Sequence, residues 1–491
     1  MNSTRGGFRE NSGRKPLNKN KKIPKQIYFP PELAKQIEDT NLLNCSSFSA
    51  KAINLISLGL KAKEQNDIKD SQCVKIADLF AGMGGIRLGF EAALRERGLT
   101  PKTVFVSEIK KSAIKVYHDN FGDFPITGDI TKVDTKDIPD LDFVLAGFPC
   151  QAFSYAGKRL GFEDTRGTLF RDVARVIRDK QPKGFLLENV EGLTTHDHGK
   201  TFKVILNVLQ NELGYKVAYK VLNSADFGLA QNRKRIYIIG TKNVKPTIGD
   251  FPSFIPATLK DIIDTSVPPV EDDFSKKLLS HYSIDELQGK QIKDKRGGKN
   301  NIHSWDFELK GSVSKEQRQL LDLMLKQRRN KKWAAVWGID WMDGMPLSLD
   351  MIHTFYQAPD LKEMLDDLVT KGYLVYEHPK KRVNNRRIYD TSKGKGYNIV
   401  TGKLSFKYSK ILSLDETTPT LVATDISHLA VPVDGGLRRL TPREGLRLFG
   451  YPEDYTLSSV STPKAYDLLG NTVAVKVIKE VAKNLLDSIQ K

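Results

Sequence analysis

Between about Lys75 and Gly240 the sequence alternates short apolar runs with amphipathic helical stretches, and this alternation constrains the fold more than any other feature. It favours a doubly wound parallel sheet with helices on both faces. The runs that we expect to form strands are 74–80, 103–107, 143–146, 185–187 and 235–239. The alternation stops near Thr241, where the composition becomes Pro-rich and then Lys/Gly-rich, and it does not return before about Leu404.

Charge and composition narrow the class of protein. The net charge is +18, and residues 1–30 hold eight Lys or Arg against one acid. Further basic runs lie at 290–299, 326–332 and 380–395, and several such clusters in one chain favour a polyanionic partner. The polar, basic N-terminus and the lack of a long apolar run predict no secretion signal and no membrane span. Three scattered cysteines and eight histidines without ligand spacing predict no disulfide framework, no metal site and a cytoplasmic location.

Cys150 stands where chemistry takes place in sheets of this kind. The apolar run 143–146 breaks at Gly147 and delivers Pro149 and Cys150 into the loop after the strand. Ligands and reacting groups gather at the carboxyl ends of the strands in an open parallel sheet. Cys150 is therefore a candidate nucleophile. The alternative is an inert buried cysteine, which is common in proteins.

Three neighbouring loops suit a nucleoside cofactor. The first expected strand runs into Phe80-Ala-Gly82-Met-Gly84-Gly85 and then into a helix, so backbone N–H groups can approach a ligand. Glu108 ends the next strand, where an acidic residue binds ribose hydroxyls, and Gly128-Asp129-Ile130 ends a third. Because the glycine spacing is not the G-x-G-x-x-G of a pyrophosphate site, S-adenosylmethionine fits better than a dinucleotide. Taken alone, the glycine turn is equally consistent with a plain tight turn.

Two further segments carry charged groups at the same edge. Leu186-Leu187-Glu188 is a strand that ends in a carboxylate, and a Glu in this place can be a general acid with a raised pKa. Its alternative is an ordinary exposed Glu at a strand end. Arg233 and Arg235 alternate at the start of the run 235–239, which puts both guanidinium groups on one face, suited to a phosphate or a carboxylate.

Taken together, these segments resemble the DNA cytosine-5 methyltransferase family. The matching motifs, in that family's order, are 80–85, Glu108, 147–151, 188–190, 231–235 and 470–473. Segments 417–432 and 440–444 also resemble the part of the family that precedes its closing helix. The resemblance covers about residues 74–240 and 404–487, and no motif position departs from the family's pattern. Six short matches in the same order make it specific.

The resemblance implies a fold and a reaction. The fold is α/β: a Rossmann-like S-adenosylmethionine-dependent methyltransferase domain, with a mixed, mostly parallel sheet flanked by helices. The reaction transfers a methyl group from S-adenosylmethionine to carbon 5 of a cytosine flipped out of a specific duplex DNA sequence. Cys150 would attack carbon 6 and form a covalent adduct, while Glu188 protonates N3. Arg235 would bind the base carbonyl, and Arg233 would orient the catalytic loop.

The resemblance also assigns residues to the cofactor and none to a metal. Phe80 would stack on adenine, Glu108 would bind the ribose and Asp129 the adenine amine. The remaining residues that it places at the cofactor are Gly82, Gly84, Gly85, Ile130, Pro149 and Asn471.

The domain plan follows from these matches. We expect a basic disordered arm (1–23), a small N-terminal β-α-α module (24–68), a catalytic cofactor-binding domain (74–240), a separate target-recognition domain (241–403) and a C-terminal return to the catalytic domain (404–491). Within 241–403 the sequence predicts a long basic helix over 314–337. It then predicts a helix with Leu361, Met364, Leu365 and Leu368 on one face, a strand from Gly372 and a basic turn. This resembles a winged-helix unit (about 314–390), and a generic helical insertion is the alternative.

The N-terminal module resembles the ribbon-helix-helix fold of small dimeric repressors. Residues 25–29 alternate as in a strand, Pro31 opens a helix, and a second helix runs from about Ser46 to Leu60. Such a module binds DNA and pairs with a second copy, so a homodimer is expected from it. A helical extension packed on the catalytic domain is the alternative.

Two other functions stay open at this point. One is an RNA (tRNA) cytosine-5 methyltransferase, against which the large insert and the basic N-terminus favour duplex DNA. The other is a DNA-binding regulator with a secondary methylation activity. For the favoured function we expect the modification enzyme of a restriction-modification system, accompanied by a cognate restriction endonuclease that is not a physical partner. The recognised DNA sequence does not follow from this sequence.

Overall fold

The computed structural model describes residues 30–40, 47–49, 51–53, 55–57, 73–149, 169–383, 386–401 and 406–490. The chain divides into two compact units, Met1–Gln72 and Cys73–Lys491. In the first unit, helix α1 (Pro31–Asp39) begins at the proline as predicted, and the described residues between 48 and 57 are helical. The strand predicted at 25–29 lies outside the described residues.

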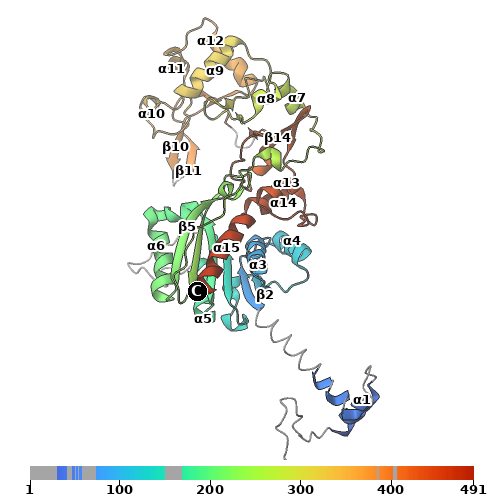
Figure 1. Ribbon diagram of the computed structural model, residues 1–491. Coiled ribbons are helices and arrows are strands. Elements are labelled where there is room, and N and C mark those ends of the chain that lie inside the picture. Colours follow the sequence, from blue (N-terminus) through green and yellow to red (C-terminus); the bar gives the residue numbers. More distant parts are fainter. Residues whose placement is uncertain are drawn as a thin grey trace, which may run out of the picture. The chain divides into compact units, whose positions relative to one another are not determined.

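The second unit contains a six-stranded sheet with the strand order β2-β1-β3-β4-β6-β5 (Figure 1). The pairs β1–β2, β1–β3 and β3–β4 are parallel, whereas β6 is antiparallel to both β4 and β5. The predicted mixed, mostly parallel sheet is therefore confirmed. The strands are β1 (Cys73–Leu79), β2 (Thr100–Ser107), β3 (Phe143–Gly147), β4 (Gly184–Val190), β5 (Lys216–Asn223) and β6 (Lys234–Thr241).

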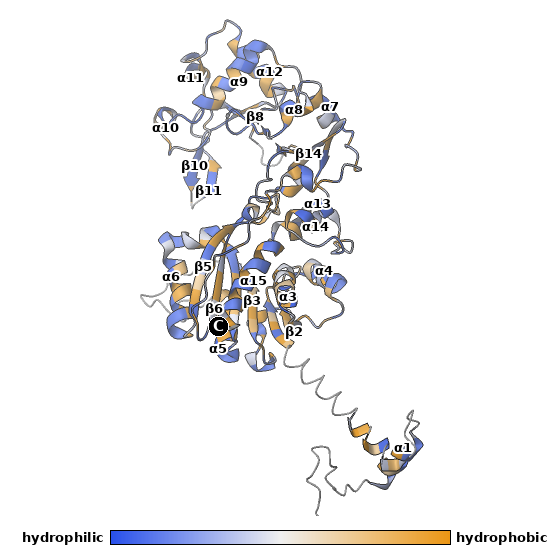
Figure 2. Cartoon of the chain, viewed as in Figure 1, coloured by the Kyte–Doolittle hydropathy of each residue, from blue (hydrophilic) through white to orange (hydrophobic). Residues whose placement is uncertain are grey.

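Helices cover both faces of this sheet, which explains why its strands are nearly continuous apolar runs. Along β4, Leu186 packs on one face with α3 (Gly85–Arg95) and α15 (Val475–Gln490). Its neighbours Phe185 and Leu187 pack on the other face, with α5 (Leu169–Lys180) and α6 (Lys200–Asn207). Figure 2 shows β3 and β6 coloured mostly hydrophobic. Helix α4 (Lys111–Phe121) follows β2.

The observed sheet differs from the prediction in two places. The prediction included no strand at β5, because this strand lies at the sheet edge and several of its side chains are exposed and polar. The segment Gly128-Asp129-Ile130 does not end a strand of the sheet. Instead, Thr127 makes a single parallel bridge to Ser107, and this bridge brings the segment to the end of β2.

A five-stranded sheet of order β15-β14-β13-β7-β8 follows in the second unit. It combines part of the insert with the chain that follows the insert, so chain from 291–302 pairs with chain from 410–439. Its elements, with the helices that accompany them, are α7 (Asp273–Leu279), α8 (Ile284–Leu287), β7 (Gln291–Ile292), β8 (Asn301–Ile302), β13 (Lys410–Ile411), β14 (Leu429–Val433) and β15 (Gly436–Arg439). Helices α13 (Pro442–Leu448) and α14 (Thr462–Gly470) then lead to α15.

Between these strands the chain forms a helical cluster with a hydrophobic core of its own. Its elements are α9 (Lys315–Gln327), α10 (Lys332–Trp337), α11 (Leu349–His353), α12 (Leu361–Thr370), β9 (Leu374–Glu377), β10 (Lys380–Val383), β11 (Arg386–Tyr389) and β12 (Gly396–Ile399). The single helix predicted over 314–337 is wrong. The helix ends at Gln327, because the next residue, the buried Arg328, turns inward and donates to Asn398. The next helix starts where the Asn330 side chain accepts a hydrogen bond from Lys332 N.

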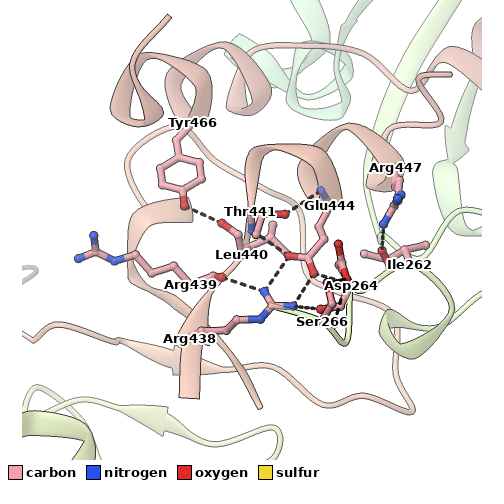
Figure 3. Close-up of polar contacts among 10 residues, drawn as sticks. All are labelled: Ile262, Asp264, Ser266, Arg438, Arg439, Leu440, Thr441, Glu444, Arg447 and Tyr466. Carbon is pink, nitrogen blue, oxygen red and sulfur yellow. Dashed lines mark hydrogen bonds and ion pairs between the residues drawn. The ribbon is translucent and has the colours of Figure 1, made fainter. Parts of the chain in front are cut away.

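A buried ion pair joins the end of this sheet to α13 (Figure 3). The Arg438 guanidinium lies 2.6 Å from the Glu444 carboxylate, and the two side chains are 1% and 0% exposed. Arg438 also donates to the Asp264 carbonyl, while Glu444 accepts from the backbone N–H groups of Thr441 and Asp264. The pair and these hydrogen bonds thereby fix the chain at Asp264 to the end of β15 and the start of α13, at the junction between the insert and the closing helices.

Among the helices of the described residues, none combines the length and the apolar character that a bilayer crossing requires.

We predict that Glu444→Ala lowers the free energy of unfolding by about 3–5 kcal/mol, because Arg438 would stay buried without its partner. Urea denaturation followed by circular dichroism measures this loss. The double variant Arg438→Met/Glu444→Leu buries no charge and should recover most of the stability. If the double variant were no more stable than the single one, packing and not charge would explain the loss.

Candidate active site

A cavity of about 860 Å³ lies at the carboxyl ends of the parallel strands, a volume in the usual range of small-molecule sites. All but two of the residues predicted for the site line it. They are Phe80, Gly82, Gly85, Glu108, Asp129, Ile130, Pro149, Glu188, Arg233, Arg235 and Asn471. The structure therefore brings together residues that are spread over nearly 400 positions of the sequence, because the sheet topology delivers successive strand ends to one edge.

The two predicted residues that are not in the list, Gly84 and Cys150, are absent from it for different reasons. Gly84 adopts a left-handed conformation (φ 78°) as the N-cap of α3, and a Cβ atom there would lie 2.3 Å from the Phe121 ring. Its position requires glycine for the turn and for this close packing, not for a place in the cavity wall. Cys150 lies outside the described residues, so its predicted position stays a prediction. The residues just before it, Phe148 and Pro149, line the cavity.

Glu108 holds the glycine loop against the end of β2. One carboxylate oxygen accepts from Gly82 N at 2.7 Å, and the other accepts from Ile109 N and Lys110 N at 2.8 and 2.7 Å. A carboxylate has about four acceptor positions. Glu108 can therefore brace the loop and still accept a hydrogen bond from a ligand hydroxyl.

Phe80 and Asp129 lie at the same end of the cavity as Glu108. Phe80 has a positive φ of 53°, which is rare and costly for a residue with a side chain and tends to occur at functional sites. Asp129 accepts from the backbone N–H and the hydroxyl of Thr131 through one oxygen. These hydrogen bonds lower the pKa of Asp129, so it is a carboxylate near neutral pH. An aromatic ring and two carboxylates thus face the same space.

Glu188 and Arg235 form the other end. Glu188 is buried at the end of β4, and Arg235 Nε lies 3.2 Å from its Oε1. Burial raises the pKa of Glu188 above its ordinary value, although Arg235 and Arg233 act in the opposite direction. The carboxyl group is therefore more readily protonated than an exposed one, as a general acid requires.

Arg233 is buried and donates to the backbone carbonyls of Leu421 and Thr472, at 3.1 and 2.6 Å. Its guanidinium also lies over the Phe449 ring. Burial lowers its pKa to about 10. Both arginines line the same cavity, as their alternation predicted, but Arg233 binds segments near the C-terminus. Its predicted role in orienting the catalytic loop stays a prediction, because that loop lies outside the described residues.

Two positioning residues were missed by the sequence-based assignment of the site. The buried Asn189 side chain donates to the Phe148 carbonyl at 2.8 Å and thereby fixes the backbone two residues before Cys150. The Gln231 side chain donates to the Leu448 carbonyl and accepts from Leu421 N. Both residues stand inside recognised motifs, but their partners are distant in the sequence, so no local pattern indicates these contacts.

The end of the cavity that is lined by Phe80, Glu108 and Asp129 fits S-adenosylmethionine. The adenosine part offers an aromatic ring, ribose hydroxyls and an amino group, which match Phe80, Glu108 and Asp129 in kind. The sulfonium is a cation, and acidic walls favour a cation over a pyrophosphate. Among the described side chains, no group of three or more His, Cys, Asp or Glu is arranged to hold a metal ion.

Comparison with known proteins decides the family. Residues 74–487 match the C-5 cytosine-specific DNA methylase family. The chain belongs to this family. It is a DNA (cytosine-5-)-methyltransferase, which transfers a methyl group from S-adenosylmethionine to carbon 5 of cytosine in DNA. The resemblance inferred from the motifs is thereby confirmed.

Several curated relatives are similar over most of this methyltransferase. It is 57% identical to the type II methyltransferase M.NlaIV of Neisseria lactamica, over 85% of this chain and 100% of the relative. It is 55% identical to M.NgoBV of Neisseria gonorrhoeae, over the same shares. M.BanI of Aneurinibacillus aneurinilyticus is 42% identical over 84% of this chain and 96% of its own.

We predict that Asn189→Ala slows methyl transfer by the methyltransferase at least tenfold while leaving its fold intact. The Phe148 carbonyl would lose its buried donor, and a small displacement of the following loop is costly in rate. Single-turnover kinetics with saturating DNA and cofactor measures the effect. Asn211→Ala, which removes an exposed asparagine side chain, is the matched control and should be as fast as wild type. Equal rates for both variants would contradict the positioning role.

Proposed function

We propose that this methyltransferase is the modification enzyme of a restriction-modification system and methylates one cytosine within a specific duplex sequence. The support is its similarity to type II methyltransferases, at 57%, 55% and 42% identity. The cognate restriction endonuclease acts on the same sequence and need not touch this chain. The net charge of +18 suits a duplex DNA substrate.

The catalytic roles in this proposal rest on the cavity. Cys150 is the nucleophile, and its thiolate adds to carbon 6 of the flipped cytosine. This assignment is supported by Phe148 and Pro149, which lie in the wall of the cavity that also contains Glu188. S-adenosylmethionine supplies the methyl group. Phe80, Glu108, Asp129 and the other predicted contacts hold the cofactor at the opposite end.

Glu188 holds and delivers a proton at N3 of the base. Attack at carbon 6 places negative charge on the ring, and a proton at N3 neutralises it. Arg235, which contacts Glu188, binds the base carbonyl and keeps the carboxyl group oriented. The single observation that carries this assignment is the buried carboxyl group with a raised pKa beside an arginine in the cavity.

The remaining parts of the chain have accessory roles in the proposal. Residues 241–403 form the target-recognition domain, because this segment is large and contains none of the catalytic motifs. The module at 24–68, with the basic arm 1–23, binds DNA and pairs with a second copy. Its support is the helix that begins at Pro31 and the helical residues between 48 and 57.

We predict that Cys150→Ser abolishes methylation. Bisulfite sequencing of DNA from cells that express wild type should show one recurrent sequence with a methylated cytosine, and the variant should show none. DNA that carries 5-fluorocytosine should trap wild type covalently, since the fluorine cannot leave as a proton does. Cys73→Ser, at the free cysteine that begins β1, is the control and should methylate and be trapped normally. Full turnover by Cys150→Ser would exclude it as the nucleophile.

We predict that Glu188→Gln lowers the rate of transfer about 100-fold or more with DNA affinity nearly unchanged, because the amide cannot donate a catalytic proton. The acid must be protonated to act. The wild-type rate should therefore fall as pH rises through the raised pKa of Glu188, and the variant should lack this fall. Glu191→Gln, at an exposed carboxyl group three residues away, is the control. A variant that lost affinity but not rate would refute the role.

A further inference from the structure

The helical cluster within the insert has the element order of a winged-helix unit. After α9 and the short α10, Leu347 pairs with Tyr397 of β12 through two backbone hydrogen bonds of 2.9 and 2.7 Å. Helices α11 and α12 follow, and then β9, the hairpin β10–β11 and β12, which is antiparallel to β9. In this arrangement α12 occupies the place of the recognition helix and β10–β11 the place of the wing.

The exposed surface of α12 is acidic. Leu361, Met364, Leu365 and Leu368 face the core of the cluster, as their spacing predicted. The side chains that remain outside include three carboxylates, Glu363, Asp366 and Asp367, and one lysine, Lys362. Lys362 is paired with Asp366 at 2.6 Å. Such a surface is repelled by the phosphates of a DNA groove, so α12 is unsuited to the place that a recognition helix takes.

The hairpin has the opposite character. Residues 379–389 contain five Lys or Arg and no acid. Seven of the eight residues in the two strands are exposed, so both faces of the ribbon are open to solvent. A two-stranded ribbon of this kind is narrow enough to approach a groove of duplex DNA.

Ion pairs neutralise the base of the hairpin but not its outer part. Lys380 lies 3.6 Å from Glu377, and Lys381 lies 3.0 Å from Asp390. Arg382, Arg386 and Arg387 have no hydrogen-bond or ion-pair partner among the described side chains. The positive charge is therefore concentrated toward the end of the hairpin.

Two of these arginines oppose each other directly. Arg382 pairs with Arg387 across the antiparallel ladder, so their side chains project from the same face. Like charges in this position destabilise a hairpin. A bound polyanion would remove the repulsion, and two adjacent guanidinium groups match the oxygens of a phosphate backbone.

We propose that the β10–β11 hairpin is the DNA-contacting element of this unit, in place of α12, and that Arg382, Arg386 and Arg387 bind phosphates of the substrate duplex. This rests on the proposed function, since the partner is the DNA that the enzyme methylates. Phosphate contacts position a protein on DNA without reading the bases. The hairpin therefore contributes affinity to the duplex, while sequence choice comes from other surfaces.

The test is the affinity of full-length enzyme for labelled duplexes, measured by fluorescence anisotropy over a range of salt concentrations. For Arg382→Gln/Arg387→Gln we expect Kd to rise about tenfold. The slope of log K against log salt should fall by about 0.9 for each phosphate that the variant no longer neutralises. The weakening should be equal on a duplex that contains the methylated sequence and on one that lacks it. The kcat at saturating DNA should change less than about twofold.

Lys362→Gln/Lys371→Gln on and beside α12 removes the same number of charges and should leave Kd and slope at wild-type values. Thermal unfolding checks that all variants are folded. The proposal is overturned if the α12 pair weakens binding as much as the hairpin pair, if the hairpin pair binds as wild type does, or if its weakening is confined to the duplex with the methylated sequence. A wild type that bound DNA through the hairpin but methylated no recurrent sequence would contradict only the proposed function.

Discussion

The buried guanidinium of Arg233 joins segments that are distant in the sequence, and the site depends on this contact. It donates to the carbonyls of Leu421 and Thr472, which are 188 and 239 positions away. Its pKa, lowered by burial to about 10, still leaves it charged near neutral pH. Because a buried charge without hydrogen bonds would be very costly, the return of the chain is fixed to the start of β6. The segment that contains Asn471 thereby closes the cavity.

The proton on Glu188 is governed by two opposing effects within the same few ångströms. Burial favours the neutral acid, and the neighbouring arginines favour the carboxylate. Neither effect alone suits the acid of the proposed mechanism, which must give up a proton and regain it. A fully ionised Glu188 could not protonate the base, and an unopposed buried acid would hold its proton too tightly. In the proposed mechanism, the contact with Arg235 tunes the acid as well as positioning it.

The charged groups on each surface of the molecule match the ligand that we propose for that surface. Carboxylates, Glu108 and Asp129, line the end of the cavity that suits a cationic nucleoside. Arginines without partners among the described side chains are gathered on β10–β11, which suits a phosphate backbone. The buried pair Arg438–Glu444 carries no net charge and fixes the junction of the insert with the closing helices.

The sheet and most of the cavity wall could be predicted from the order of the residues alone. Buried strands are continuous apolar runs, and the residues just after them must meet at one edge, so β1, β2, β3, β4 and β6 could be predicted with their site residues. The other features depend on contacts between segments that are distant in the sequence. The edge strand β5 lacks an apolar pattern, and the break after Gln327 depends on the contact of Arg328 with Asn398. The partners of Asn189 and Arg233 are likewise set by packing between remote segments, which no local pattern encodes.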